Sequence, residues 1–223
     1  MEWMRTIDGY CERMDPGYWA EPLNAVTNAA FLIAAAIMWV RVRHSGLGLA
    51  HTLVILLAGI GVGSYLFHTH AQVWAAFADS GFIAMFCVVY VFAINRDYLG
   101  LRGWRAYGAT GLFIPYVVAT VPIFAMLPFF QISSGYWPLP LLLGLYGLAL
   151  RQRAPATARG LWAATGLVCV SLIFRSLDET LCAVNPLGTH FVWHILNGVL
   201  LGWLIEVYLR HMRGPLAAPL RGR

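Results

Sequence analysis

The chain consists of long apolar stretches separated by short polar segments. A helix needs about 20 apolar residues to cross the roughly 30 Å hydrocarbon core of a bilayer, and seven stretches meet or approach this length. The pattern therefore predicts an all-α, integral membrane bundle of seven transmembrane helices, formed by one domain over residues 1–223. The predicted spans are Pro22–Val40, Leu49–Phe67, Val73–Ile94, Trp104–Phe124, Trp137–Leu150, Leu161–Leu181 and His190–Leu209.

The composition supports a membrane protein. Of the 223 residues 60% are hydrophobic and only 11% are charged, whereas about a quarter of an ordinary soluble domain is charged. A chain this poor in charge would expose too much apolar surface in water. The composition excludes a soluble globular enzyme and a disordered chain, and it argues against a nucleic-acid binder despite the net charge of +5.

The basic residues, all arginine, predict the orientation in the membrane. With seven spans, twelve arginines fall on the side of the C-terminus and three on the other side. Because positive residues concentrate on the inner side of a membrane, we expect the N-terminus outside and the C-terminus inside. Residues 1–21 then form an acidic outer segment, retained in the mature protein, and residues 210–223 form a basic inner tail. The membrane would be the bacterial inner membrane in a bacterium, or that of the endoplasmic reticulum or Golgi in a eukaryote.

Five polar residues gather at the predicted outer ends of three helices. Ionisable residues at membrane depth are costly and usually face the bundle interior with a function. Residues four apart share a helical face, as do Ser64 and His68, and also His190 and His194. Asp79 re-enters the membrane after a short turn. We therefore expect the three imidazoles to converge on one point beside Ser64 and Asp79.

Three neutral imidazoles favour a catalytic zinc site, because they leave a fourth coordination position open. Zinc lowers the pKa of a bound water towards about 7 and polarises carbonyl groups. In such a site Asp79 would orient the water or shuttle its proton. Ser64 would donate a hydrogen bond to a developing oxyanion.

Other interpretations of these histidines remain open. The imidazoles could be hydrogen-bonded residues between helices, or they could bind haem axially. His70 is a substitute zinc ligand, although it falls past the predicted helix end. His44, His51 and His211 lie on the predicted inner side, where we expect interfacial residues.

The spacing of these residues resembles that of the alkaline ceramidases. The matching pattern is Ser64-x3-His68, then Asp79 eleven residues on, then His190-x3-His194, and the segment Trp19–Asn28 resembles the family's approach to its first helix. More loosely, the chain is similar to the seven-helix hydrolase superfamily that includes the adiponectin-type receptors. The resemblance implies zinc held by the three histidines, with the serine and the aspartate completing the site.

The same resemblance implies a calcium site and a disulfide near the N-terminus. The calcium ligands would be Asp8, Glu12 and Glu21 with the Tyr10 carbonyl, and oxygen ligands suit calcium. Met14 falls where the family has a side-chain oxygen, and Asp15 is a possible replacement; an acidic solvated segment without calcium is the alternative.

The cysteines separate into two pairs. Cys11 and Cys182 lie on the predicted outer side, where an oxidising compartment permits a disulfide, and the resemblance implies that they form one. Cys87 and Cys169 lie within predicted helices as small apolar residues. Near Cys182, we expect Arg175, Asp178 and Glu179 to form an ion-pair network.

These observations predict a zinc-dependent intramembrane amide hydrolase. Its substrate would be ceramide or a similar long-chain N-acyl lipid, and its products a sphingoid base and a fatty acid. Its partners would be the bilayer and its lipid substrate, with no nucleic acid or protein partner implied. The alternative is a seven-helix receptor or membrane sensor with a structural zinc site.

Overall fold

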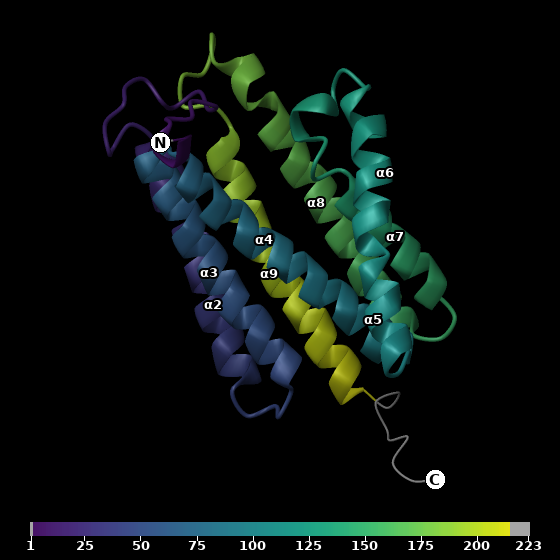
Figure 1. Ribbon diagram of the computed structural model, residues 1–223. Coiled ribbons are helices and arrows are strands. Elements are labelled where there is room, and N and C mark those ends of the chain that lie inside the picture. Colours follow the sequence, from purple (N-terminus) through teal and green to yellow (C-terminus); the bar gives the residue numbers. More distant parts are fainter. Residues whose placement is uncertain (1, 215–223) are drawn as a thin grey trace, which may run out of the picture.

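The computed structural model describes residues 2–214, which form an elongated bundle of helices (Figure 1). These residues contain no β-strand, only an isolated bridge between Thr6 and Gln72. The last part of the predicted basic tail, with Arg221 and Arg223, lies outside the described residues. The elements are η1 (Glu2–Met4), α1 (Pro22–Thr27), α2 (Ala29–Val42), α3 (Gly48–His70), α4 (Val73–Ala93), η2 (Ile94–Tyr98), α5 (Trp104–Gly111), α6 (Phe113–Ala125), η3 (Gln131–Ser133), α7 (Pro138–Leu150), α8 (Pro155–Leu181) and α9 (His190–Arg213).

Within residues 2–214, six helical stretches are long and apolar enough to cross a membrane, so the chain has the character of a multi-pass membrane protein. They are Pro22–Val42, Gly48–His70, Val73–Tyr98, Trp104–Ala125, Pro155–Leu181 and His190–Arg213. The seventh predicted span corresponds to α7, which has only 13 residues. The count of seven crossings and the orientation of the termini therefore stay predictions.

The predicted start of the sixth span was wrong by six residues. Helix α8 begins at Pro155 rather than at Leu161. Proline suits the first turn of a helix because its missing N–H would have no intrahelical partner there. Arg159 interrupts the apolar run, but a long arginine side chain near a helix end can place its charge in water while its stem stays on apolar surface. Because Arg159 interrupts the apolar run, the sequence pattern places the start of this helix too late.

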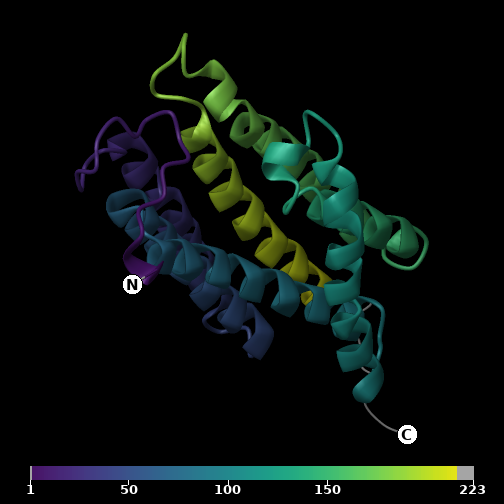
Figure 2. The same ribbon diagram turned by 45° about the horizontal axis from the view of Figure 1, so that its top comes forward.

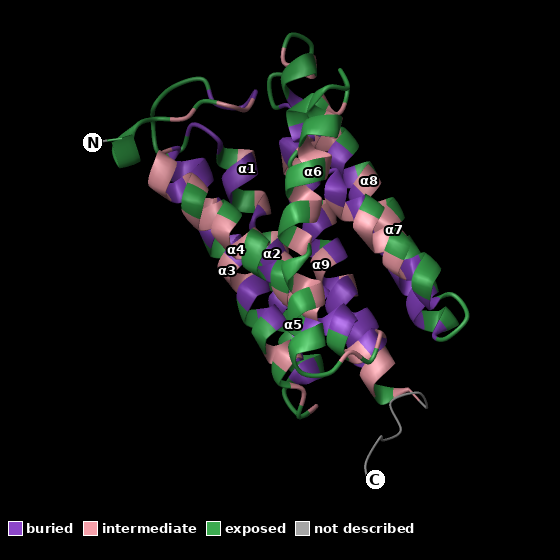
Figure 3. Cartoon of the chain, turned by 45° about the vertical axis from the view of Figure 1, so that its right-hand side comes forward, coloured by how far each residue is buried: buried purple, intermediate pink, exposed green. Residues whose placement is uncertain are grey.

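Helix α9 forms the centre of the bundle (Figures 2 and 3). It packs against α2, α3 and α8, and more than half of its apolar window is buried. Gly198 allows the close approach of α2, because a Cβ at this position would lie 2.9 Å from the carbonyl carbon of Ala30. Since His190 and His194 are in the first two turns of this central helix, its packing fixes their depth.

The helical pair α5–α6 lies at the periphery. No residue of α6 is buried, and its apolar side chains, such as Ile114 and Val118, are about two-thirds exposed. Figure 3 shows this part of the bundle mostly as exposed surface. A helix this apolar and this exposed suits contact with lipid acyl chains.

Ion pairs tie the helices together at the end of the bundle away from the N-terminal segment. Glu206 in α9 pairs with Arg41 in α2 at 2.6 Å and with Arg210 one turn further along α9 at 2.8 Å. Asp97 in η2 pairs with Arg96 and accepts a hydrogen bond from Tyr208. The acids at this end are thus neutralised by arginines, whereas His68, His190 and His194 lie at the opposite end of α3 and α9.

Candidate metal centre

The three predicted histidines converge. His68 comes from the last turn of α3, and His190 and His194 come from the start of α9. One ring nitrogen of each lies within 4.8 Å of the others, and all three side chains are buried. The convergence expected from the four-residue spacings is therefore confirmed, and the cluster could hold a metal ion.

Hydrogen bonds at the outer faces of the rings orient two of these imidazoles. His68 Nδ1 lies 2.6 Å from the Glu21 carboxylate, and His194 Nδ1 lies 3.0 Å from the Thr27 hydroxyl. Metal-binding histidines usually have such a partner on the nitrogen that does not face the metal. Both partners come from the start of the first apolar helix, which therefore backs the cluster.

Two buried ring nitrogens have no hydrogen-bond partner within residues 2–214. They are His190 Nδ1 and His194 Nε2. Buried polar atoms are nearly always paired in native proteins, so these nitrogens call for a partner. A metal ion held by the cluster would be such a partner, and imidazole nitrogen is a ligand that zinc prefers. The donor set therefore fits a zinc ion.

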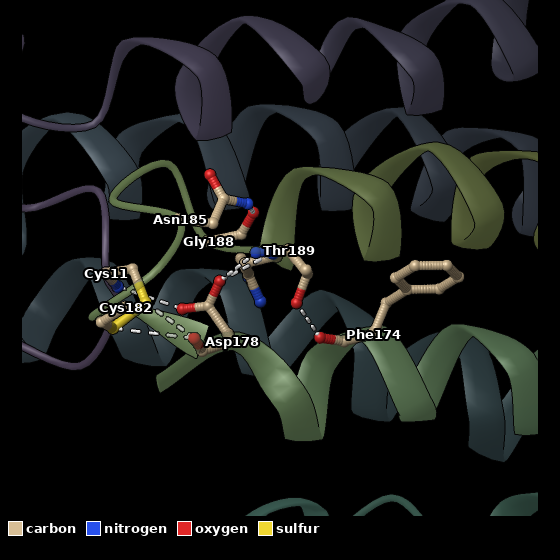
Figure 4. Close-up of a disulfide and its surroundings, with 8 residues drawn as sticks. Cys11, Phe174, Asp178, Cys182, Asn185, Gly188 and Thr189 are labelled. Carbon is tan, nitrogen blue, oxygen red and sulfur yellow. Dashed lines mark hydrogen bonds between the residues drawn. A yellow bond between two sulfur atoms is a disulfide. The ribbon is translucent and has the colours of Figure 1, made fainter. Parts of the chain in front are cut away.

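Asp178 fixes the start of α9 and with it His190 (Figure 4). Its carboxylate accepts hydrogen bonds from the backbone N–H groups of Thr189 at 2.6 Å, His190 at 2.8 Å and Cys11 at 3.1 Å. The first N–H groups of a helix have no intrahelical acceptor and carry partial positive charge. A carboxylate from α8 thus caps the helix that carries two of the histidines.

The disulfide between Cys11 and Cys182 is present, as predicted. It joins the N-terminal segment to the residue that follows α8, across 171 residues of sequence. The Cα atoms are 5.2 Å apart, within the usual range for such a bond. Together with Asp178, the disulfide holds the N-terminal segment against the histidine end of the bundle.

The expected ion-pair network beside this disulfide does not form. Within residues 2–214, Arg175 makes no ion pair with Asp178 or Glu179. Its guanidinium instead donates to the Ile132 carbonyl and the Ser133 hydroxyl. The prediction was wrong because the free backbone N–H groups of α9 compete for the Asp178 carboxylate. The region beside the disulfide is instead stabilised by the cap that Asp178 forms on α9.

Ser64 and Asp79 lie at the same end, where α3 and α4 come close together. A Cβ at Gly63 would be 3.0 Å from the Ala78 carbonyl oxygen and 3.1 Å from the Asp79 nitrogen, so only glycine permits this approach. Within residues 2–214 the Ser64 hydroxyl and Asp79 Oδ1 are buried and have no hydrogen-bond partner in other residues, and the two side chains lie close enough to interact with each other. Ser64 is one helical turn from His68, so this pair lies beside the cluster.

The ring of Tyr10 covers part of the histidine cluster. It stacks on His190 with 3.9 Å between ring centroids and lies 5.2 Å from His68. Burial raises the pKa of the Tyr10 hydroxyl above its ordinary value, despite the opposing charge of Arg175. The phenol thus stays neutral, and the N-terminal segment shields the cluster from water.

The other histidines lie away from the cluster. His70 is the last residue of α3 rather than past its end, but its side chain is exposed and contacts Tyr18 and Trp74. His51 Nδ1 lies 2.9 Å from the Leu47 carbonyl, and His211 hydrogen-bonds Thr157 near the far end of α9. His44 is exposed in the turn after α2.

The predicted calcium ligands do not gather around one point. Asp8 is exposed, and the Tyr10 carbonyl accepts the Arg13 N–H. Both Glu12 oxygens accept backbone N–H groups at the start of α1, at 2.6 and 2.8 Å. Burial raises the pKa of the Glu12 carboxyl, although these two N–H groups oppose the shift. Among the described residues the histidines form the only cluster of three or more potential metal-ligating side chains, so the acidic set does not fit calcium.

Both carboxylate oxygens of Glu21 bind side chains of the protein and not a calcium ligand set. Its oxygens lie 2.5 Å from Arg13 Nε and 2.6 Å from His68 Nδ1. Burial alone would raise the pKa of Glu21, but the hydrogen bonds and charges of His68 and Arg13 hold it below its ordinary value. Met14 is exposed, and Asp15 Oδ1 accepts the N–H of Gly17.

An apolar cavity inside the bundle lies next to the histidine cluster, although none of the three histidines lines it. Phe31 and Trp193, which line it, pack against His194. Its lining continues along α9 from Trp193 to Leu204, which corresponds to about 16 Å of helix. The only amide side chain in the lining is Asn197. Such a cavity suits a long hydrocarbon chain.

Sequence reasoning missed four residues that shape this centre. Thr27 and Asp178 were given no role toward the histidines, Glu21 was taken for a calcium ligand, and Arg13 was counted only as a charge. One signal was visible: a carboxylate directly before Pro22, at the start of an apolar helix.

No family model matches the chain, and a search of curated proteins gives no match either.

Proposed function

We propose that this protein is a zinc-dependent intramembrane amide hydrolase that cleaves ceramide or a similar long-chain N-acyl lipid. The observation that carries the proposal is the cluster of three buried histidines, two of them with a ring nitrogen that has no partner within residues 2–214, next to the buried side chains of Ser64 and Asp79. A purely structural site would not need a carboxylate and a hydroxyl beside it. The resemblance to the alkaline ceramidases supports the same activity.

The residues of the site divide the chemistry among them. Bound by His68, His190 and His194, zinc would polarise the amide carbonyl and acidify a water molecule. Asp79 accepts the proton of the attacking water and returns one to the leaving amine. Ser64 donates a hydrogen bond to the oxygen that gains negative charge. Glu21 and Thr27 keep the rings of His68 and His194 in place.

The apolar cavity supports the proposed substrate class. An acyl chain lying along α9 between Trp193 and Leu204 would place its carbonyl end beside the histidines. The polar part of the lipid would then face the N-terminal segment. The protein would thus bind its lipid within the bilayer. This bilayer would be the bacterial inner membrane, or the endoplasmic reticulum or Golgi membrane of a eukaryote.

The proposal is tested by measuring metal content and lipid-amide hydrolysis on the same purified, detergent-solubilised sample. We expect about one zinc per chain and release of fatty acid from a labelled N-acyl sphingoid lipid. His194→Ala removes a ligand, so it should lose both, whereas His70→Ala should keep both because His70 points away from the cluster. Zinc without hydrolysis of any N-acyl lipid would favour a receptor or sensor, and a coloured protein would indicate haem.

A further inference from the structure

An arginine is buried next to the metal centre. The Arg13 side chain is about 3% exposed, although it belongs to a segment whose neighbouring residues 14–19 are all exposed. Its three nitrogens each have an acceptor: Nε the Glu21 carboxylate at 2.5 Å, Nη1 the Asp15 carbonyl at 3.2 Å and Nη2 the His68 carbonyl at 3.1 Å. Every nitrogen of the guanidinium therefore donates one hydrogen bond.

These acceptors belong to three parts of the fold that must meet for the centre to form. Asp15 is in the N-terminal segment, Glu21 precedes α1, and His68 is in the last turn of α3. The final carbonyls of a helix have no intrahelical donor and carry partial negative charge, so a cation is favourable there. Arg13 supplies that cation and neutralises the Glu21 carboxylate at the same time.

The oxygens that surround Arg13 are of the kind that binds a divalent cation. Calcium is held by six to eight oxygens from carboxylates, carbonyls and waters. Here the Glu21 carboxylate and two carbonyls already surround a guanidinium, and the Glu12 carboxylate is used by the N-terminus of α1. A second cation at this place would meet the charge of Arg13 at close range.

We propose that Arg13 is a built-in cation that replaces calcium in this chain, and that it positions His68 through Glu21. The guanidinium fixes one Glu21 oxygen, so the other stays on His68 Nδ1 and leaves Nε2 of that ring for the metal. The claim that Arg13 replaces calcium does not depend on the activity of the protein. The positioning part rests on the proposed metal centre.

The calcium part is tested on the unmodified protein. Chelators of calcium would also remove zinc, so calcium is added to protein purified in calcium-free buffer, with magnesium as the control for ionic strength. We expect no heat of calcium binding by calorimetry and the same Tm with either cation. Saturable calcium binding with a rise in Tm that magnesium does not produce would overturn the proposal.

The positioning part is tested with Arg13→Met, which keeps an unbranched apolar stem and removes the guanidinium with its charge. The matched control is Arg5→Met, in the same segment, where the exposed Arg5 side chain forms no hydrogen bond or ion pair within residues 2–214. We expect Arg13→Met to bind zinc about 10- to 100-fold more weakly, the usual effect of losing a group that supports a metal ligand. Arg13→Lys should lose less, because it keeps the cation.

The spectrum of cobalt-substituted protein distinguishes positioning from general loosening. The visible bands of Co²⁺ report the geometry of its ligands, so Arg13→Met should shift them while Arg5→Met should not. The variant Cys11→Ser with Cys182→Ser loosens the same segment but keeps Arg13, and it should retain the wild-type spectrum. Wild-type zinc affinity and cobalt spectrum in Arg13→Met would overturn the positioning role. Absence of any metal binding in the unmodified protein would instead refute the proposed function.

Discussion

At the scale of single residues, spacing predicted which side chains meet but not what holds them. The pairs Ser64/His68 and His190/His194 are four residues apart within helices, and helical geometry alone puts each pair on one face. The contacts of His68 with Glu21 and of His194 with Thr27 span 47 and 167 residues. They depend on how α1 packs against α3 and α9, which no periodicity in the sequence encodes.

The role proposed for Asp79 can be separated from metal binding by a mutation. Within residues 2–214 its Oδ1 is buried with no hydrogen-bond partner other than the adjacent Ser64, and Asp79 is not part of the histidine cluster. Asp79→Asn nearly preserves the shape of the side chain but cannot accept a proton. We expect this variant to keep its zinc and its Tm while its rate falls by roughly 10²- to 10⁴-fold, the usual loss for a missing general base. Zinc content, thermal unfolding and hydrolysis are measured on one sample.

The control for this variant is Asp8→Asn, which makes the same change at an exposed position of the N-terminal segment. It should leave the rate unchanged. Undiminished hydrolysis by zinc-loaded Asp79→Asn would refute Asp79 as the base. Loss of zinc from that variant would make Asp79 a ligand.

At the scale of elements, the centre depends on how helix ends are capped. Asp178 accepts three backbone N–H groups, two of them at the start of α9. Asp178→Asn would turn one acceptor into a donor facing an N–H group, so the start of α9 should fray and His190 should lose its fixed position. We expect weaker zinc binding and faster amide exchange at residues 189–191. The next residue supplies the control, because Glu179→Gln changes an exposed acid that makes no side-chain hydrogen bond within residues 2–214; equal exchange in both variants would contradict the capping role.

The contact between α3 and α4 gives a second test at this scale. A methyl group added by Gly63→Ala would press on backbone atoms at Ala78 and Asp79 at 3.0–3.1 Å. Backbone cannot yield as a side-chain end can, so we expect the helices to separate slightly at a cost of about 1–3 kcal/mol. Gly166→Ala in α8 is the control, because nothing lies within 4 Å of its added Cβ, and it should unfold at the same or a higher Tm. An unchanged Tm for Gly63→Ala would show that this approach is not tight.

At the scale of the whole molecule, the question is whether α7 crosses the membrane. Its 13 residues span only about 20 Å, less than the roughly 30 Å of the hydrocarbon core. The turn-rich segment before it makes up part of the difference. Ile132 and Ser133 are held by Arg175 near the disulfide end of α8, whereas α7 ends close to the start of α8 (Figure 1). If α7 crosses, its continuous apolar length does not show the crossing, because prolines and turns interrupt this segment.

A crossing by α7 has a consequence that labelling can test, because it makes the number of crossings odd. The two ends of α7 would then lie on opposite sides, as the first span already predicts for the N-terminal segment and the loop between α2 and α3. We expect Pro16→Cys and Gly135→Cys to react with a membrane-impermeant maleimide in intact cells. His44→Cys and Arg153→Cys should react only after permeabilisation, since the arginine-rich loops should stay inside. The parent protein, with Cys87 and Cys169, gives the background. Reaction of Gly135→Cys and Arg153→Cys from the same side would show that α7 does not cross, and the bundle would then have six spans.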